Sequence, residues 1–204
     1  ATEAALIGSL VHHGWNRDLA IVSDDAGQFN VFLHALCWVH AERTIEVLVG
    51  YSDRQRRLLE SVKKDIWELY RQLKKYRLAP HSNTKADLKK GFDSIFGQKT
   101  GYASLDNALK RIGRNKSELL LVLDRPDIPL HNNLSERDIR EYVKRRKISG
   151  STRSEEGRLC RDSFTSLKKT CRKLGISFWQ YLLDRVQDNQ QIAPLPDVMI
   201  RAAT

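Results

Sequence analysis

The spacing of hydrophobic residues predicts an α/β segment at the start of the chain. Residues 2–13 have helical spacing, whereas residues 19–22 are all apolar and include two β-branched residues. A short apolar run that ends at Asp24 is typical of a strand buried on both faces. A second buried strand or a helix end is expected at residues 31–38, followed by a helix that continues to about residue 49.

Farther along the chain, hydrophobic residues follow the period of an α-helix. The longest such segment covers residues 53–79, where apolar residues recur at steps of four and three, as in a coiled-coil seam. The residues of this seam are Leu58, Val62, Ile66, Leu69, Leu73 and Tyr76. Pro80 should end the helix. Two further helices are expected at about 84–96 and 102–113, and a short apolar one at 119–123.

Helical spacing returns after a loop that contains two prolines. A helix should begin with Asn133 as its N-cap, because Glu136 lies three positions later in the pattern of a capping box. Another helix is expected over residues 154–174. Four of its side chains should face inward: Leu159, Phe164, Leu167 and Cys171. A last helix is expected at 177–187, and the tail from Gln190 should be loose.

These patterns divide the 204 residues into four parts. We expect a partial α/β core at residues 1–43, an all-helical insertion at 44–123, the C-terminal part of the core with the Glu136 helix at 124–187, and a tail at 188–204. The predicted fold class is therefore α/β, although the chain should be mostly helical overall. A hydrophobic content of 41% suffices for a packed core, so disorder is not expected.

The charge balance indicates a polyanionic partner. Lys and Arg outnumber Asp and Glu, and the net charge of +10 favours nucleic acid as the first candidate. A ribosome-associated or membrane-surface protein would show the same balance. Three widely spaced cysteines imply no disulfide framework and fit a reducing cytoplasm. No apolar run approaches the roughly 18–20 residues that span a bilayer, and no signal-peptide pattern opens the chain.

Two acidic residues far apart in the sequence are candidate metal ligands. Asp24 follows a predicted strand, and chemistry in open α/β sheets collects at the carboxyl ends of strands. Cleavage of a phosphodiester by two metal ions needs carboxylates from different segments, and Glu136 is suited to supply the second. The alternative is purely structural. Glu136 would then complete the capping box or pair with Arg140, and Asp24 or Asp25 would cap the turn near Gly27.

Two further features also have two interpretations each. Cys37 and His40 have the spacing of half a zinc site, but no second Cys/His pair follows at suitable spacing, so a buried cysteine and a hydrogen-bonded histidine are the alternative. The predicted helix at 53–79 has a face rich in Lys and Arg, which serves either solvation or contact with DNA phosphates.

Several sequence elements occur together in a recognisable order. They are Ser23-Asp-Asp-Ala-Gly-Gln-Phe29, Cys37-Trp-Val-His-Ala-Glu-Arg43, Ile128-Pro-Leu-His-Asn-Asn-Leu-Ser-Glu-Arg-Asp-Ile-Arg140, Arg146-Lys147, Gly150-Ser151 and Gly175-Ile-Ser-Phe-Trp-Gln-Tyr-Leu182. Over about residues 15–187 the chain resembles the catalytic domain of a bacterial insertion-sequence transposase of the insertion sequence 66 family. The most specific element is Asn-Asn-x-x-Glu-Arg with the basic run that follows it.

The resemblance implies a partial ribonuclease-H-like fold with a large helical insertion between the second and third residues of a DDE triad. Such a triad binds two Mg²⁺ or Mn²⁺ ions. These enzymes cleave a DNA strand at the element end with water, and the freed 3′-hydroxyl then attacks target DNA in transposition, a form of recombination. Carried over to this sequence, the catalytic and metal-binding acids are Asp24 and Glu136.

The resemblance also implies roles for neighbouring residues. The expected DNA-binding residues are Arg137, Arg140, Lys144, Arg145, Arg146 and Lys147. The expected supporting residues are Asp25, Asn133, Cys37, His40 and Arg43. The implied partners are element-end and target DNA, with no membrane, in the bacterial cytoplasm at the nucleoid. The oligomeric state stays open, a homo-oligomer included.

Two departures from the family pattern bear on activity. The position after the second acid is commonly Gly and here is Asp25, whereas Asp24 directly follows the strand and is therefore our choice of ligand. The first Asp of the triad should lie on a strand before the helix at 2–13. We therefore expect that the first strands and one catalytic residue are missing and that this chain is inactive alone. The alternative functions are a non-catalytic basic DNA-binding module and a ribonuclease-H-like nuclease.

Overall fold

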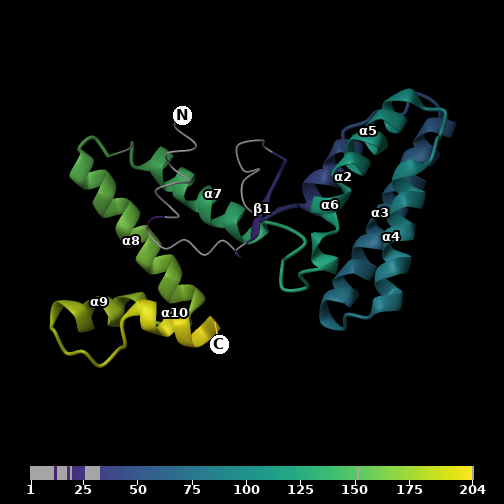
Figure 1. Ribbon diagram of the computed structural model, residues 1–204. Coiled ribbons are helices and arrows are strands. Elements are labelled where there is room, and N and C mark those ends of the chain that lie inside the picture. Colours follow the sequence, from purple (N-terminus) through teal and green to yellow (C-terminus); the bar gives the residue numbers. More distant parts are fainter. Residues whose placement is uncertain (1–11, 13–17, 19, 26–32, 151, 204) are drawn as a thin grey trace. The chain divides into compact units, whose positions relative to one another are not determined.

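The computed structural model describes residues 12, 18, 20–25, 33–150 and 152–203 (Figure 1). His12 is helical, but the rest of the helix predicted at 2–13 and the turn at Gly27 lie outside the described residues. Contacts between Cα atoms divide the chain into two compact units, residues 1–132 and 133–204. Each unit is described below by itself.

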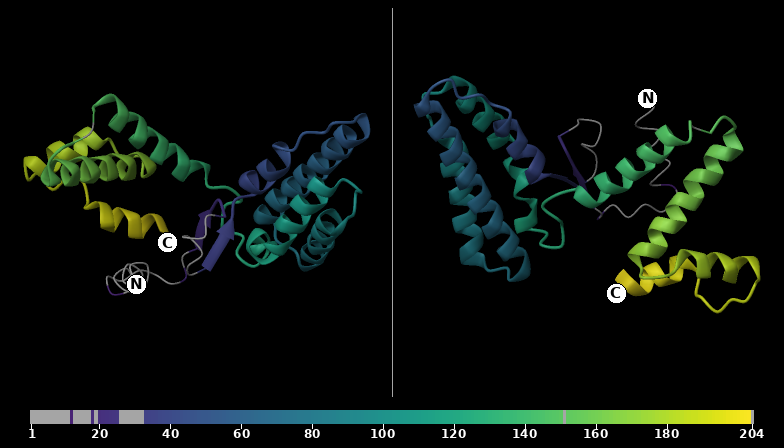
Figure 2. Two further views of the ribbon diagram at one scale, coloured as in Figure 1. Left: turned by 90° about the horizontal axis from the view of Figure 1, so that it is seen from above. Right: turned by 180° about the vertical axis from the view of Figure 1, so that it is seen from behind.

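A small parallel sheet opens the first unit. Strand β1 (Ala20–Ser23) pairs in parallel with β2 (Leu33–Leu36) (Figure 2). In this register Ser23 lies opposite Leu36. Both predicted strands are therefore confirmed. The expected burial of the first strand on both faces is wrong, because only Ser23 is fully buried and the other residues of β1 are half-buried. The reason is that β2 is its only paired neighbour among the described residues.

The other regular elements that the structure describes in the first unit are helices. They are α2 (Trp38–Glu46), α3 (Asp53–Leu78), α4 (Ser82–Gly97), α5 (Ala103–Arg114), the single turn α6 (Lys116–Leu119) and the 3-10 helix η2 (Leu121–Leu123). The predicted seam of α3 is confirmed except at its start, where Leu59 is buried and Leu58 is only half-buried. With Leu59 as its first residue, the buried seam alternates strictly between steps of three and four, whereas a seam that begins at Leu58 has two steps of four in succession. The chain is thus mostly helical, as predicted.

Trp38, just after β2, packs against the helical block and links it to the end of this strand. Its side chain is 1% exposed and meets the Phe92 ring edge-on, with the ring centroids 6.1 Å apart. Its indole Nε1 donates to the Leu119 carbonyl at 2.9 Å, and its backbone N–H donates to the Leu130 carbonyl at 3.0 Å. One side chain therefore joins the strand end, α4 and α6 in a common core.

In the second unit, the structure describes four helices over residues 133–150 and 152–203. They are α7 (Asn133–Ile148), α8 (Glu155–Lys173), α9 (Phe178–Val186) and α10 (Leu195–Ala203). Helix α7 begins at Asn133, so the N-cap predicted for this residue is wrong by one position. The basic run that follows Val143 occupies the last turn of α7, where positive charge complements the helix dipole.

Ion pairs join α7 to α8 more than apolar contacts do. Lys169 pairs with Asp138 at 3.0 Å and also with Glu141, and Lys173 pairs with Asp138 at 2.8 Å. Lys173 and then Lys169 lower the pKa of Asp138, and Lys169 lowers the pKa of Glu141. No residue of α7 is buried. The prediction that Leu159 and Phe164 face inward is therefore wrong, since they are 61% and 44% exposed. Cys171, by contrast, is fully buried as expected.

The loose tail predicted from Gln190 is also wrong. Asp184 organises the loop before α10, because its carboxylate accepts the backbone N–H groups of Gln191 at 2.8 Å and Ile192 at 3.3 Å. Leu195, at the start of α10, is buried in a core with Cys171. The C-terminal segment is therefore held by a buried carboxylate and a small apolar cluster.

Asp184→Asn is expected to lower the melting temperature by roughly 5 °C, because an asparagine amide places an N–H group against a backbone donor. Asp188→Asn, an exposed change nearby, should have no effect.

The ionisation of Asp184 gives this effect a pH dependence. Burial opposes ionisation, but Arg185 and the two backbone donors outweigh it and lower the pKa of Asp184. A depressed pKa stabilises the fold above the ordinary aspartate pKa, so the difference from wild type should shrink as the pH falls below it. A difference that grows in acid would contradict this assignment. Thermal unfolding followed by circular dichroism at several pH values measures both effects.

Candidate active site

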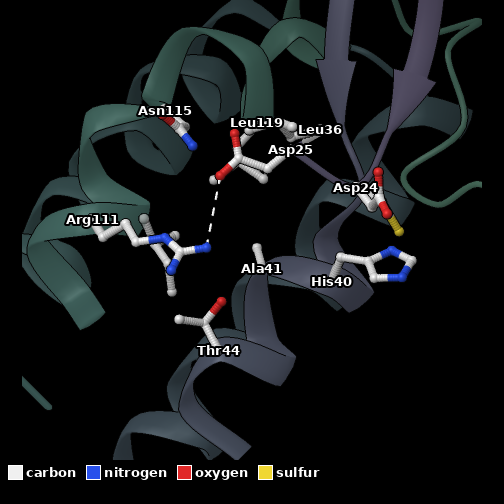
Figure 3. A pocket seen from close by; sticks show the side chains of 11 residues that line it. Asp24, Asp25, Leu36, His40, Ala41, Thr44, Arg111, Asn115 and Leu119 are labelled. Carbon is white, nitrogen blue, oxygen red and sulfur yellow. Dashed lines mark ion pairs between the residues drawn. The ribbon is translucent and has the colours of Figure 1, made fainter. Parts of the chain in front are cut away.

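The carboxyl ends of β1 and β2 meet at the candidate site. Because the strands are parallel, the acidic turn after β1 lies beside the start of α2, and the Cys37 N–H donates to the Ser23 carbonyl at 2.8 Å. A pocket of about 30 Å³ opens here (Figure 3). Its lining is Asp24, Asp25, Leu36, Cys37, His40, Ala41, Thr44, Arg111, Ile112, Asn115 and Leu119. Such a volume admits a group of about one or two water molecules.

The two aspartates of the turn differ in their surroundings. Asp25 has a φ of 71° and directs its carboxylate toward Arg111, with Oδ2 3.9 Å from Nη2. Asp24 lies on the side of the pocket near His40 (Figure 3), is exposed, and has no hydrogen bond or ion pair with any residue that the structure describes. Asp24 is therefore the carboxylate that is available to a ligand.

The element from Cys37 to Arg43 forms the first turns of α2 and borders the pocket. Cys37 is buried, and His40 Nε2 lies 3.2 Å from Arg43 Nη1. Glu42, on the inner face of the helix, is also buried, and this burial together with the charge of Glu46 raises the pKa of Glu42. Over the described ranges, no three His, Cys, Asp or Glu side chains gather as a metal-binding group.

A buried chain of polar side chains begins at Ser23, the residue before Asp24. Ser23 Oγ lies 2.7 Å from His34 Nε2, and His34 Nδ1 lies 2.9 Å from Glu118 Oε1. When Nδ1 donates to Glu118, Nε2 of the neutral ring accepts the Ser23 hydroxyl. This chain ties the last residue of β1 to β2 and α6. Sequence reasoning missed it, because nothing in the local pattern links His34 to a glutamate 84 positions away.

Glu136 and the predicted DNA-binding residues all lie on α7, in the second unit. Glu136 is in the first turn of this helix. Arg145 pairs with Glu141 at 2.9 Å, whereas the other predicted DNA-binding cations are exposed and form no ion pair within the described part of the chain. Those cations are Arg137, Arg140, Lys144, Arg146 and Lys147. Asn133, a predicted supporting residue, opens the helix and is half-buried.

The structure places the two predicted ligands in different compact units. Asp24 belongs to the first unit and Glu136 to the second, so their meeting at one metal site stays a prediction. The donor type fits the predicted ions, because carboxylate oxygens are the ligands that Mg²⁺ prefers and Asp24 is exposed with no partner among the described side chains.

Residues 20–159 match the model of the Transposase IS66 family. The chain belongs to this family. The matched segment of this IS66-family chain contains both Asp24 and Glu136 and the whole helical block between them.

A protein of Sinorhizobium fredii (strain NBRC 101917 / NGR234), named "Uncharacterized protein y4jO", is 53% identical over 194 residues. The alignment covers 95% of this IS66-family chain and 60% of that protein, so the chain spans about three fifths of the relative's length. No solved structure matches the chain. Among the helices that the structure describes, none has the length and hydrophobicity needed to cross a membrane.

Proposed function

We propose that this chain is part of the catalytic domain of a DDE transposase that cleaves a DNA strand and transfers it to target DNA. The observation that carries the proposal is the exposed Asp24 carboxylate at the carboxyl end of β1, inside the segment that matches the transposase family. No described side chain neutralises this carboxylate. A carboxylate left without a partner at a strand end is what a metal-dependent enzyme of this kind requires.

The proposed fold is a partial ribonuclease-H-like fold. Two parallel strands followed by α2 and a helical block support it, since the block lies between Asp24 and Glu136 in the sequence. In this proposal β1 and β2 belong to a larger sheet, and the helical block over residues 44–123 forms the insertion.

Asp24 and Glu136 would hold the two Mg²⁺ or Mn²⁺ ions. When bound, these ions lower the pKa of the attacking water and stabilise the charge that develops on the phosphodiester. Ser23, the residue before Asp24, is held by the buried contact of its hydroxyl with His34, and this contact would fix the backbone that carries Asp24. Arg137 and Arg140, one helical turn apart on α7, would bind phosphate oxygens of the DNA backbone.

A non-catalytic DNA-binding module is the second candidate. The exposed cations in the last turn of α7, in a chain with a net charge of +10, favour contact with phosphates whether or not chemistry follows. Arg145 would contribute less than its neighbours to either function, because Glu141 already neutralises part of its charge.

Nicking of supercoiled plasmid DNA tests the proposal. The 204-residue chain and a form extended to the length of its relative are incubated with plasmid and Mg²⁺, Mn²⁺ or EDTA. We expect nicked circles from the extended form with either metal and none with EDTA. Binding without nicking by both forms would favour the DNA-binding module. Nicking by the 204-residue chain would contradict the expectation that it lacks a catalytic residue.

A further inference from the structure

Arg111 brings a cation from the helical block to the pocket beside Asp24. It lies in the last turn of α5, and its side chain is 65% exposed. Its contact with Asp25 is an ion pair at 3.9 Å, which is too long for a hydrogen bond. Its guanidinium N–H donors make no hydrogen bond with any side chain or carbonyl that the structure describes. The donors of Arg111 are therefore available to a ligand.

Two neutral polar side chains face the same space. Figure 3 shows Thr44 of α2 and Asn115, which follows α5, on the pocket wall with Arg111 and Asp25. The pocket holds about 30 Å³, which admits an oxygen-bearing group but not a nucleobase. A phosphate oxygen fits both the size and the donors, because a guanidinium binds two phosphate oxygens through parallel N–H groups and hydroxyl and amide groups can add one hydrogen bond each.

We propose that Arg111 binds a backbone phosphate of the DNA strand that lies at Asp24, with Thr44 and Asn115 as its polar neighbours. This inference rests on the proposed function, because it takes DNA as the ligand. It gives the helical block a direct part in the site: α5 supplies the arginine that binds the phosphate, and the turn after β1 supplies the proposed metal-binding acid. Asp25 competes with the phosphate for Arg111, since both are anions within reach of the same guanidinium.

DNA affinity of the 204-residue chain tests the assignment. The probe is a short fluorescently labelled DNA duplex, titrated in EDTA so that no cleavage occurs, and binding is read by fluorescence anisotropy at several salt concentrations. Arg111→Ala should weaken binding about five- to tenfold and reduce the slope of log affinity against log salt by about 0.9, as for the loss of one phosphate contact. The DNA affinity of Arg111→Lys should lie between that of Arg111→Ala and that of the wild type.

Arg114→Ala is the matched control. Arg114 is also an exposed arginine at the end of α5 but does not line this pocket, so its loss should change affinity less than about twofold. Equal losses from the two variants would overturn the proposal, and so would a wild-type chain that does not bind the duplex. Circular dichroism of each variant reports whether the helices remain folded, and Arg111→Lys keeps the test valid if Arg111→Ala unfolds.

Asp25→Asn separates phosphate binding from a purely structural ion pair. If Arg111 binds DNA, removal of the competing carboxylate should strengthen binding about twofold or more. If Arg111 serves only to hold Asp25, the Asp25→Asn and Arg111→Ala variants should change affinity in the same direction, which would overturn the proposal. Failure of the proposed function would look different: plasmid nicking would be absent from every form while the Arg111 effect on affinity remained.

Discussion

Asp24→Asn is expected to lower metal-dependent DNA nicking about a thousandfold in the extended form of the protein. The carboxamide is neutral, so it cannot offset the charge of a divalent cation, and it offers one oxygen in place of two. Asp24 is suited to this role because it directly follows β1, is exposed, and lacks a partner among the described residues. The initial rate of plasmid nicking at saturating Mg²⁺ measures the effect.

Asp25→Asn is the matched control for this experiment. Its carboxylate faces Arg111, so its loss should change the nicking rate less than about tenfold. A larger loss from Asp25→Asn than from Asp24→Asn would identify Asp25 as the metal ligand.

Glu136→Gln should reduce nicking as strongly as Asp24→Asn and leave DNA affinity unchanged, because glutamine preserves the shape of the side chain but not its charge. If Glu136→Gln lowers stability and DNA affinity together, Glu136 stabilises the N-terminal turn of α7 and is not a catalytic residue. Equal nicking rates in the wild type and in both variants would contradict the proposed transposase mechanism.

Trp38→Ala is expected to destabilise the first unit by about 3–5 kcal/mol. The change removes a buried indole that packs against Phe92 and leaves the Leu119 carbonyl without its donor. The cavity would lie where the strand end, α4 and α6 meet, and the surrounding helices are too closely packed to collapse fully into it. Urea unfolding followed by circular dichroism gives the free energy of unfolding.

Two control variants separate the causes of this effect. Trp38→Phe keeps most of the ring but removes the indole donor, so it should cost about 1–3 kcal/mol. Trp179→Ala removes an exposed tryptophan and should cost less than about 0.5 kcal/mol. A loss below about 1 kcal/mol in Trp38→Ala would show that the helical block holds the strand end without this side chain.

The secondary structure of the described chain was largely predictable. The apolar run before Asp24 gave β1, and the helical period over 53–79 gave α3 to within about a residue at each end. Family membership was also readable from short motifs, and the match over residues 20–159 confirms it. These features depend on the order and spacing of nearby residues, which is why a single sequence suffices for them.

Contacts between distant segments were decided by the tertiary structure alone. The approach of Arg111 to Asp25 and the buried chain from Ser23 through His34 to Glu118 left no periodic signal. The contacts of Asp184 with the loop before α10 are closer in sequence but are not periodic either. The same holds for Leu159, which has helical spacing and yet is 61% exposed. Spacing along a chain determines which face of an element is apolar, whereas the partner of each side chain depends on how whole elements pack.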